Sequence, residues 1–215
     1  MIMSLHYYSR IRFTTNLLPL LRNSTLPTGS RVVSVFAAGL ESMGTLYPLD
    51  LSLRETNHYS FANKRKTVVH MTTMAFEHLA HENAGRVAFV HVFPGLVVTP
   101  AFDGEQLPWW VRKVWRVARP ALQWTVAVTP ERIGQTVTFL LCGEGFPALG
   151  KGKEGMVGGT DGDLGSGAYA VGYDGESCGV ERHYVELRKQ GFEKRVWEHT
   201  MEAFEVIAKG DMFRK

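Results

Sequence analysis

Residues 165–170 have the letters of a dinucleotide-binding turn. They read GSGAYA, which matches the pattern G-x-G-x-x-A. In a phosphate-binding turn the glycines lie between a buried strand and the first turn of a helix, where backbone N–H groups and the helix dipole face the phosphates. Here no apolar strand precedes the motif, and the residues that follow, VGYDGES, are typical of a turn. We therefore predict turns and no phosphate binding at this segment.

Acidic and histidine side chains at two places could in principle bind a metal ion. Asp161 and Asp163 lie beside glycines, but the further ligands of a calcium loop are absent. His78 and His81 lie three residues apart on a predicted helix, yet neither a carboxylate nor a cysteine partner is identifiable. We predict turns at the aspartates, surface or interface positions for the histidines, and no metal site.

An aromatic and basic segment, 107–124, holds four of the five tryptophans. Its valines share one face of a predicted short helix that ends near Pro120, and its arginines share another face. Such a segment can lie in a membrane interface or cover a substrate pocket as a lid. We favour the lid, with Trp109, Trp110 and Trp115 over an apolar pocket.

The elements that must position any site begin with two short apolar runs, 31–38 (RVVSVFAA) and 86–93 (RVAFVHVF). Their β-branched residues predict strands buried on both faces. Between them, 59–82 predicts an amphipathic helix that Gly85 ends. The apolar residues on one face of this helix are Phe61, Val68, Met71, Ala75 and Leu79. Two buried strands joined by a helix pair in parallel, so the predicted fold class is α/β, a parallel sheet with flanking helices.

Other helices are predicted around this unit. One runs over 5–18 and is disturbed by Pro19. Another runs over 129–142, with Thr129 as N-cap and Gly143 as C-cap, and a last one spans 192–208. Thirteen of the 22 glycines fall within 143–179, which predicts loops and one strand at 168–173.

Length and composition fit a single domain, 1–215, of ordinary globular character, with 45% apolar and 21% charged residues. The net charge of +3 is too small for a nucleic-acid binder. Cys142 and Cys178 lie far apart, as suits reduced thiols. The N-terminus lacks the apolar core of a signal peptide, and the stretch 87–98 is too short for a transmembrane segment. We therefore predict a cytoplasmic protein.

In this order the elements resemble the second half of a short-chain dehydrogenase/reductase (SDR), from about Leu5 to Cys142. The matching pieces are the helix ending NLLPLL, the strand RVVSVFAAG, the helix from Tyr59, and the strand that leads into PGLVVTP. The resemblance implies a partial, Rossmann-like parallel sheet, the truncated SDR fold, with 143–215 as a glycine-rich loop and C-terminal helix extension. The tail looks like a divergent fungal branch of specialised metabolism.

The same resemblance implies an acid/base role for Tyr59. The family's lysine position, four residues later, holds Asn63, and Lys64 follows one place late. A residue five places on lies ~140° around a helix, so Lys64 faces elsewhere unless Tyr59 precedes the first turn. With that provision, Lys64 is the expected helper of Tyr59.

The resemblance also assigns positions around this pair. Ala37 stands where the family has a serine that polarises the carbonyl, and Ser42, five residues on, could replace that hydroxyl. His6 stands where an asparagine would complete a proton relay. The residues expected to contact the cofactor are Pro94, Gly95, Val97 and Thr99.

The family binds NAD or NADP chiefly through a glycine-rich turn in its first β-α-β unit, and only five residues precede His6. Three explanations stay open: an incomplete gene model, a partner that covers the exposed sheet edge, or a function without the dinucleotide. Because the helix 59–82 supplies the oligomer contact in the family, we expect a homo-oligomer or a heteromer through it.

Three functions follow. The first is an NADP-dependent reductase or dehydrogenase of specialised metabolism that acts on a small apolar substrate, polyketide- or terpenoid-like. The second is a non-redox isomerase, dehydratase or cyclase in which Tyr59 with His6 or Ser42 moves protons. The third is a non-catalytic partner subunit. The usual chemistry of the family places the oxidoreductase first.

Overall fold

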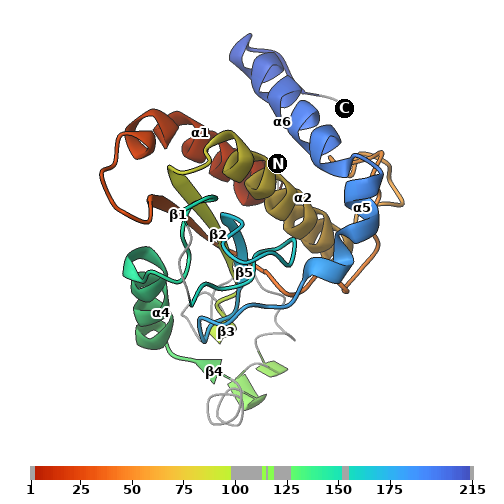
Figure 1. Cartoon of the computed structure of the whole chain (residues 1–215). Coiled ribbons are helices and arrows are strands. Elements are labelled where there is room, and N and C mark those ends of the chain that lie inside the picture. The colour runs from red at the N-terminus through yellow and green to blue at the C-terminus, as the bar shows by residue number, and fades with distance from the viewer. Residues whose placement is uncertain (1–2, 98–112, 115, 119–126, 152–154, 214–215) are drawn as a thin grey trace.

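The computed structural model describes residues 3–97, 113–114, 116–118, 127–151 and 155–213. At its centre lies a three-stranded parallel sheet in the order β1-β2-β5 (Figure 1). The strands of this sheet are β1 (Ser30–Val35), β2 (Val87–Val92) and β5 (Ala168–Val171). A separate parallel pair consists of β3 (Leu96–Val97) and β4 (Ala127–Val128). This arrangement confirms the predicted α/β class, a small Rossmann-like sheet flanked by helices.

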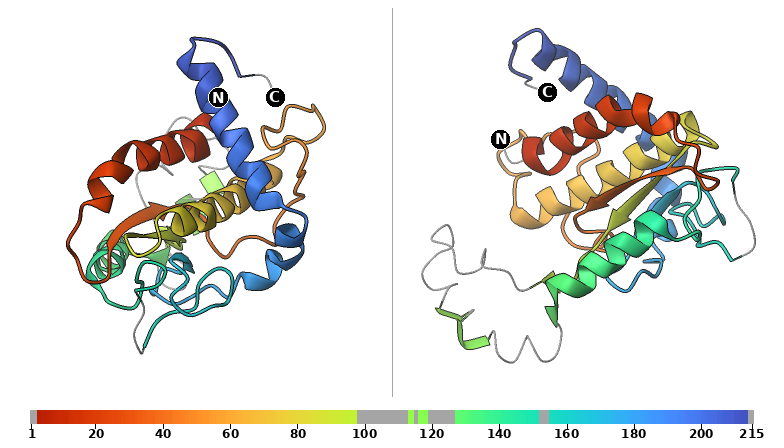
Figure 2. Two further views of the ribbon diagram at one scale, coloured as in Figure 1. Left: turned by 45° about the horizontal axis from the view of Figure 1, so that its top comes forward. Right: turned by 90° about the vertical axis from the view of Figure 1, so that its left-hand side faces the viewer.

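Helices lie on both sides of the three-stranded sheet (Figure 2). On one side lie the π-helix η1 (Ser4–Tyr8), α1 (Ser9–Arg22), α2 (Phe61–Glu82) and α6 (Phe192–Ala208), with α6 packed against α2. On the other side lies α4 (Pro130–Cys142). The short helices η3 (Glu181–His183) and α5 (Val185–Lys189) lead into α6.

The central strand β2 divides the core into two parts. All six of its residues are buried, as expected for the middle strand of a parallel sheet. Val87 and Phe89 pack with residues of α1, α2 and α6, whereas Val90 and Val92 pack with residues on the side of α4. This alternation is why 86–93 reads as a continuous apolar run.

The first helix continues beyond Pro19 to Arg22, so the predicted end near Leu18 was wrong. Proline cannot donate a hydrogen bond to the carbonyl four residues earlier, here that of Thr15. Pro19 is exposed and lies in the last turn of the helix, where water can reach backbone groups. Leu18 is buried beside it and anchors this end of α1 to the core.

The central helix begins at Phe61, and the Ser60 hydroxyl caps it by accepting the N–H of Asn63 (3.1 Å). Four of the five predicted core residues are buried, but Phe61 is 71% exposed because it lies in the first turn, beyond the end of the packed region. Fourteen of the 22 residues of α2 are buried, since α6 covers a second side of the helix. Association with another chain through 59–82 stays a prediction.

The remaining elements agree with the sequence patterns. Thr129 caps α4 by accepting the N–H of Arg132, and β5 and α6 fall within their predicted ranges. The first three residues of the 165–170 motif lie in a turn region and the last three belong to β5, so no helix follows the glycines. The Asp161 carboxylate accepts the N–H of Asp163 (3.0 Å) in that turn region. The predicted lid falls mostly outside the described residues, as do Trp109, Trp110 and Trp115.

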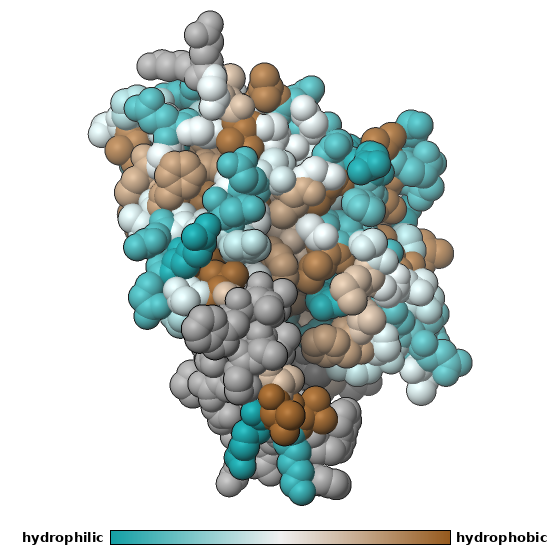
Figure 3. Space-filling model, turned by 90° about the horizontal axis from the view of Figure 1, so that it is seen from below, coloured by the Kyte–Doolittle hydropathy of each residue, from teal (hydrophilic) through white to brown (hydrophobic). Residues whose placement is uncertain are grey.

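None of the described helices is both long and apolar enough to cross a bilayer. On the face seen in Figure 3, apolar side chains are interspersed with hydrophilic ones.

Candidate functional site

The carboxyl ends of the parallel strands share one edge of the sheet, and η1 and α2 begin near that edge because they run against β1 and β2. His6, in η1, lies against the ring of Phe36, the residue that follows β1, with 5.4 Å between ring centroids. The structure therefore places His6 at the edge where the resemblance expects a proton relay.

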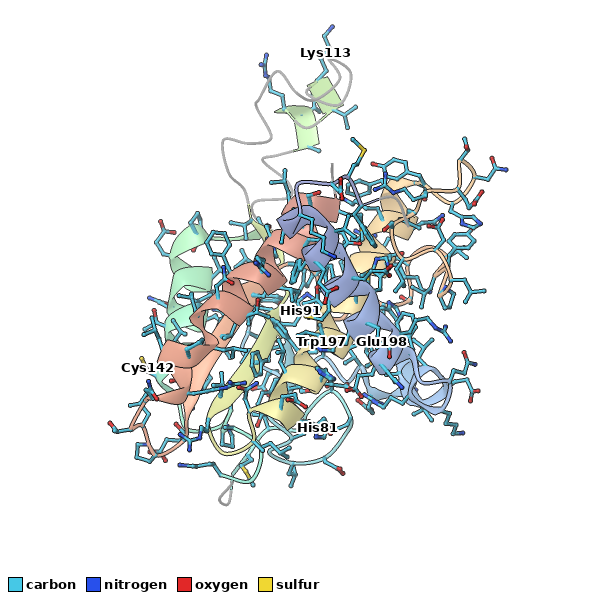
Figure 4. The ribbon with its side chains drawn as sticks, turned by 90° about the horizontal axis from the view of Figure 1, so that it is seen from above. His81, His91, Lys113, Cys142, Trp197 and Glu198 are labelled. Carbon is cyan, nitrogen blue, oxygen red and sulfur yellow. The ribbon has the colours of Figure 1, made fainter. Side chains whose placement is uncertain are left out.

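A second histidine, His91, lies near the carboxyl end of β2, in the interior of the molecule (Figure 4). Its Nε2 accepts the backbone N–H of Ala37 (3.3 Å), and its Nδ1 lies 3.4 Å from the Thr73 hydroxyl. Because Nε2 accepts, the ring proton is on Nδ1 and is donated to Thr73. Complete burial, with Arg10 as a second cause, lowers the pKa of His91 to about 3. The imidazole therefore stays neutral and fixes the first residues of the loop after β1.

Tyr59 lies just before the capping residue Ser60 and is half exposed. It precedes the first helical turn, so the ~140° separation expected between two helical residues does not apply to Tyr59 and Lys64. Because Tyr59 precedes the first turn, the two side chains are not forced onto different faces of α2, and the predicted pairing of Lys64 with Tyr59 stays open.

Lys64 is only 6% exposed, and its ammonium lies 4.8 Å from the centroid of the Phe61 ring. Among the described residues this ammonium has neither a hydrogen bond nor an ion pair. Burial, with Arg65 as a second cause, lowers the pKa of Lys64. A cation near the start of a helix also opposes the helix dipole. Costly placements of this kind are concentrated at functional sites, so Lys64 is a strong candidate.

Asn63, at the family's lysine position, has a structural role. Its side-chain N–H donates to the carbonyl of His58 (2.9 Å), and its carbonyl accepts the N–H of Thr45 (2.9 Å). It joins two parts of the loop 36–60 at the start of α2, and a helper role for Lys64 stays a prediction.

Ser42 is exposed and lies in the loop before α2, which runs beside the first turns of that helix. The Lys66 ammonium donates to the carbonyl of Gly44 (3.1 Å), and Thr45 is held by Asn63. Ser42, Tyr59 and Lys64 thus belong to one region around the start of α2, but among the described residues no hydrogen bond joins them.

The segment from Pro94 to Val97 connects the two sheets. Gly95 has φ +72°, and a Cβ there would lie 2.6 Å from Cγ2 of Val128. Val97 pairs with Val128 across β3 and β4. In the described structure this segment is therefore explained by protein packing, and its predicted contact with a cofactor stays a prediction. Thr99 lies outside the described residues.

The described residues at this edge of the sheet do not form a complete binding site for a dinucleotide. The Lys64 ammonium could hold a ribose hydroxyl, but among the described residues no glycine-rich turn joins a strand to a helix, as a diphosphate requires. We therefore derive no hydride-transfer step from this structure.

The described residues also form no cluster of three or more side chains that could hold a metal ion. His78 lies at the interface of α2 and α6, where its Nδ1 is 3.1 Å from the Glu193 carboxylate and its ring stacks on Trp197. Figure 4 shows His81 away from the sheet edge that carries His91.

Comparison with known proteins identifies similar fungal proteins. The chain is 33% identical over 211 residues, 94% of its length, to the short-chain dehydrogenase/reductase SAT2 of Stachybotrys chartarum. The chain is thus similar to part of a short-chain dehydrogenase/reductase. It is also 31% identical over 213 residues to the oxidoreductase andH of Emericella variicolor.

The chain covers 58% of SAT2 and 59% of andH, so it spans about three fifths of the length of these relatives. No family model matches the sequence. No solved structure matches it either.

Proposed function

We propose that this chain is an oxidoreductase of specialised metabolism that interconverts a carbonyl and a hydroxyl group on a small apolar substrate. The observation that carries the proposal is the largely buried side chain of Lys64, five residues from the half-exposed phenol of Tyr59. The similar proteins SAT2, a short-chain dehydrogenase/reductase, and andH, an oxidoreductase, support this class of reaction. We further propose NADP as the hydride carrier and a polyketide- or terpenoid-like substrate.

In this proposal Tyr59 gives a proton to the carbonyl oxygen, or takes one from the hydroxyl. A phenol is a weak acid with a pKa of about 10 in water, so a nearby cation is needed to stabilise its ionised form. The Lys64 ammonium is the cation proposed for this task, because among the described residues no carboxylate competes for its charge. His6 relays the proton to solvent, and Ser42 supplies a hydrogen bond to the substrate oxygen.

A second candidate is a non-redox isomerase, dehydratase or cyclase. The observation that favours it is the lack, in the described part of the chain, of a turn that could hold a diphosphate. Tyr59 with His6 or Ser42 would then transfer protons without a hydride carrier.

Titration of the chain with NADPH by calorimetry separates the two candidates. We expect the wild-type chain to bind NADPH, Lys64→Met to bind at least about tenfold more weakly, and Lys66→Met to bind as the wild type does. Lys66 is the matched control, since it lies on the same helix with the same charge. A wild-type chain that binds no NADPH overturns the redox proposal and favours the non-redox one.

Turnover tests the role of Tyr59 separately. A panel of apolar ketones with NADPH should be reduced by the wild-type chain, and Tyr59→Phe should lower kcat at least about a hundredfold with NADPH binding retained. Tyr59→Phe with full activity would remove the phenol from the mechanism.

A further inference from the structure

Three side chains that the proposed reaction does not use meet between η1, the loop 36–60 and α6. They are Tyr8, Ser52 and His199. The Tyr8 hydroxyl lies 2.7 Å from Nε2 of His199 and 3.2 Å from the Ser52 hydroxyl. The Ser52 hydroxyl lies 3.4 Å from the same nitrogen. A histidine beside a serine can activate it as a nucleophile, and the two atoms are often this far apart before a substrate binds.

The backbone around two of these residues departs from ordinary geometry. Tyr8 belongs to a π-helix, a rare form that occurs frequently at functional sites. Leu53, which follows Ser52, has φ +52°, and in the described part of the chain no other residue except glycine has a positive φ. A bulky residue adopts this conformation at a cost that proteins retain mainly where it positions a functional group. Leu53 is buried, so the core fixes the turn that carries the Ser52 hydroxyl.

A hollow of about 410 Å³ reaches His199 from the surface. Its charged lining residues are two arginines and two acids, Arg54, Arg195, Asp50 and Glu55. Since the two signs balance, the hollow suits an uncharged ligand better than an ion. Pro48, Leu49 and Leu51 add apolar surface. An uncharged apolar ester, whose acyl carbon a serine can attack, combines these requirements.

We propose that Ser52, His199 and Tyr8 form a second active site, which hydrolyses a small uncharged ester. The Ser52 oxygen bonds to the acyl carbon, the serine proton passes to Nε2 of His199, and the carbonyl electron pair moves onto its oxygen. When this species collapses, the bond to the alcohol oxygen breaks and the alcohol leaves with the proton from His199. Water then attacks the acyl-serine by the same steps, which releases the carboxylic acid and restores Ser52.

Tyr8 has a defined part in these steps. In the tautomer that they require, Nε2 of His199 carries no proton and accepts from the Tyr8 phenol. Burial raises the pKa of the phenol, which therefore keeps its proton at neutral pH. Once Nε2 has taken the serine proton, it no longer accepts from Tyr8. The phenol is then available to donate to the oxyanion that forms beside it.

Labelling of the wild-type chain with diisopropyl fluorophosphate tests the nucleophile. We expect one adduct, located on Ser52 by mass spectrometry of the digested chain, and labelling of His199→Gln at least about a hundredfold slower. The matched control is His81→Gln, which changes an exposed histidine on another helix and should be labelled at the wild-type rate. A wild-type chain without an adduct on Ser52, or equal slowing of both variants, overturns the proposal.

Hydrolysis of 4-nitrophenyl acetate tests turnover. Ser52→Ala deletes one oxygen at a half-buried position and should lower kcat/KM at least about a hundredfold, whereas Ser24→Ala, at an exposed serine, should stay within about twofold of the wild type. Tyr8→Phe should lower kcat about a hundredfold with little change in KM, an effect that a purely structural phenol would not have. Ser52→Ala with wild-type activity overturns the proposal. Neither assay contains NADPH, so failure of the oxidoreductase proposal leaves both outcomes unchanged.

Discussion

The imidazole of His91 accepts the backbone N–H of Ala37 at 3.3 Å, inside a part of the molecule that water does not reach. Ala37 stands at the position where the family resemblance expects a serine hydroxyl. In this chain a bond between β2 and the end of β1 holds that position, and the hydroxyl must come from elsewhere. Ser42, in the loop that follows, is the candidate for it.

Neutral buried histidines make the stability of the fold sensitive to acid. Burial lowers the pKa of His91 to about 3 and that of His70 to about 4, below the ~6.5 of an unfolded histidine. As the pH falls below about 6.5, the unfolded chain therefore binds protons first, and the free energy of unfolding falls by about 1.4 kcal/mol per pH unit for each histidine. Urea unfolding at pH 7, 6 and 5 measures this slope.

His70→Gln isolates one of the two contributions. Its slope between pH 6 and 5 should be smaller than that of the wild type by about 1.4 kcal/mol per pH unit. Equal slopes in the two proteins would show that His70 titrates alike in the folded and unfolded chains.

The burial of Lys64 should cost stability. Lys64→Met fills the same volume without a charge, so we expect the free energy of unfolding to rise by about 1 kcal/mol at neutral pH. Lys66→Met, whose ammonium lies nearer the surface, should change it by less than about 0.5 kcal/mol. Urea unfolding of both variants checks the difference, and a less stable Lys64→Met would contradict it.

Gly95 is required by the packing between the two sheets. Gly95→Ala places a methyl group against Val128 in a backbone conformation that alanine rarely adopts, so we expect a loss of about 1–3 kcal/mol. Gly134→Ala, on an exposed and unobstructed part of α4, should instead raise stability by up to about 1 kcal/mol. In thermal unfolding, we expect the midpoint to fall for Gly95→Ala and to rise for Gly134→Ala.

The segment 155–191 is tied to α2 by a buried ion pair. Glu77 accepts two N–H groups of Arg188 (3.0 and 2.6 Å) and the Thr160 hydroxyl (2.7 Å). Arg188→Met should cost about 3 kcal/mol, because it leaves a buried carboxylate without its cation.

The control for that ion pair is Lys189→Met, which removes an exposed partner 3.7 Å from Glu186 and should cost less than about 0.5 kcal/mol. The loss in the free energy of unfolding, measured by chemical denaturation, should therefore be several times larger for Arg188→Met than for Lys189→Met. Similar losses would mean that the buried pair adds nothing beyond a surface contact.

The β-α-β unit was predictable because its signals are local: apolar runs at 31–38 and 86–93 and a helical period between them. The cap at Thr129 is local as well. The extent of burial of α2 was not predictable, because α6 packs on it from more than 100 residues further along the chain. A helix covered on two sides does not show one simple apolar face.

The site was predictable only in part, for the same reason. His6, Ser42, Tyr59 and Lys64 were assigned by order along the chain, and the structure brings their segments to one edge of the sheet. His91 was missed, although a single polar residue inside the apolar run RVAFVHVF was a usable signal. Its partners, Ala37 and Thr73, come from other elements, and no local pattern identifies them.

The ring of Phe213 packs against Tyr8 and His199, with centroids 6.4 and 5.2 Å apart. Residues near the two ends of the described chain therefore meet on one patch of the surface. A change at this one ring would therefore loosen η1 and α6 together.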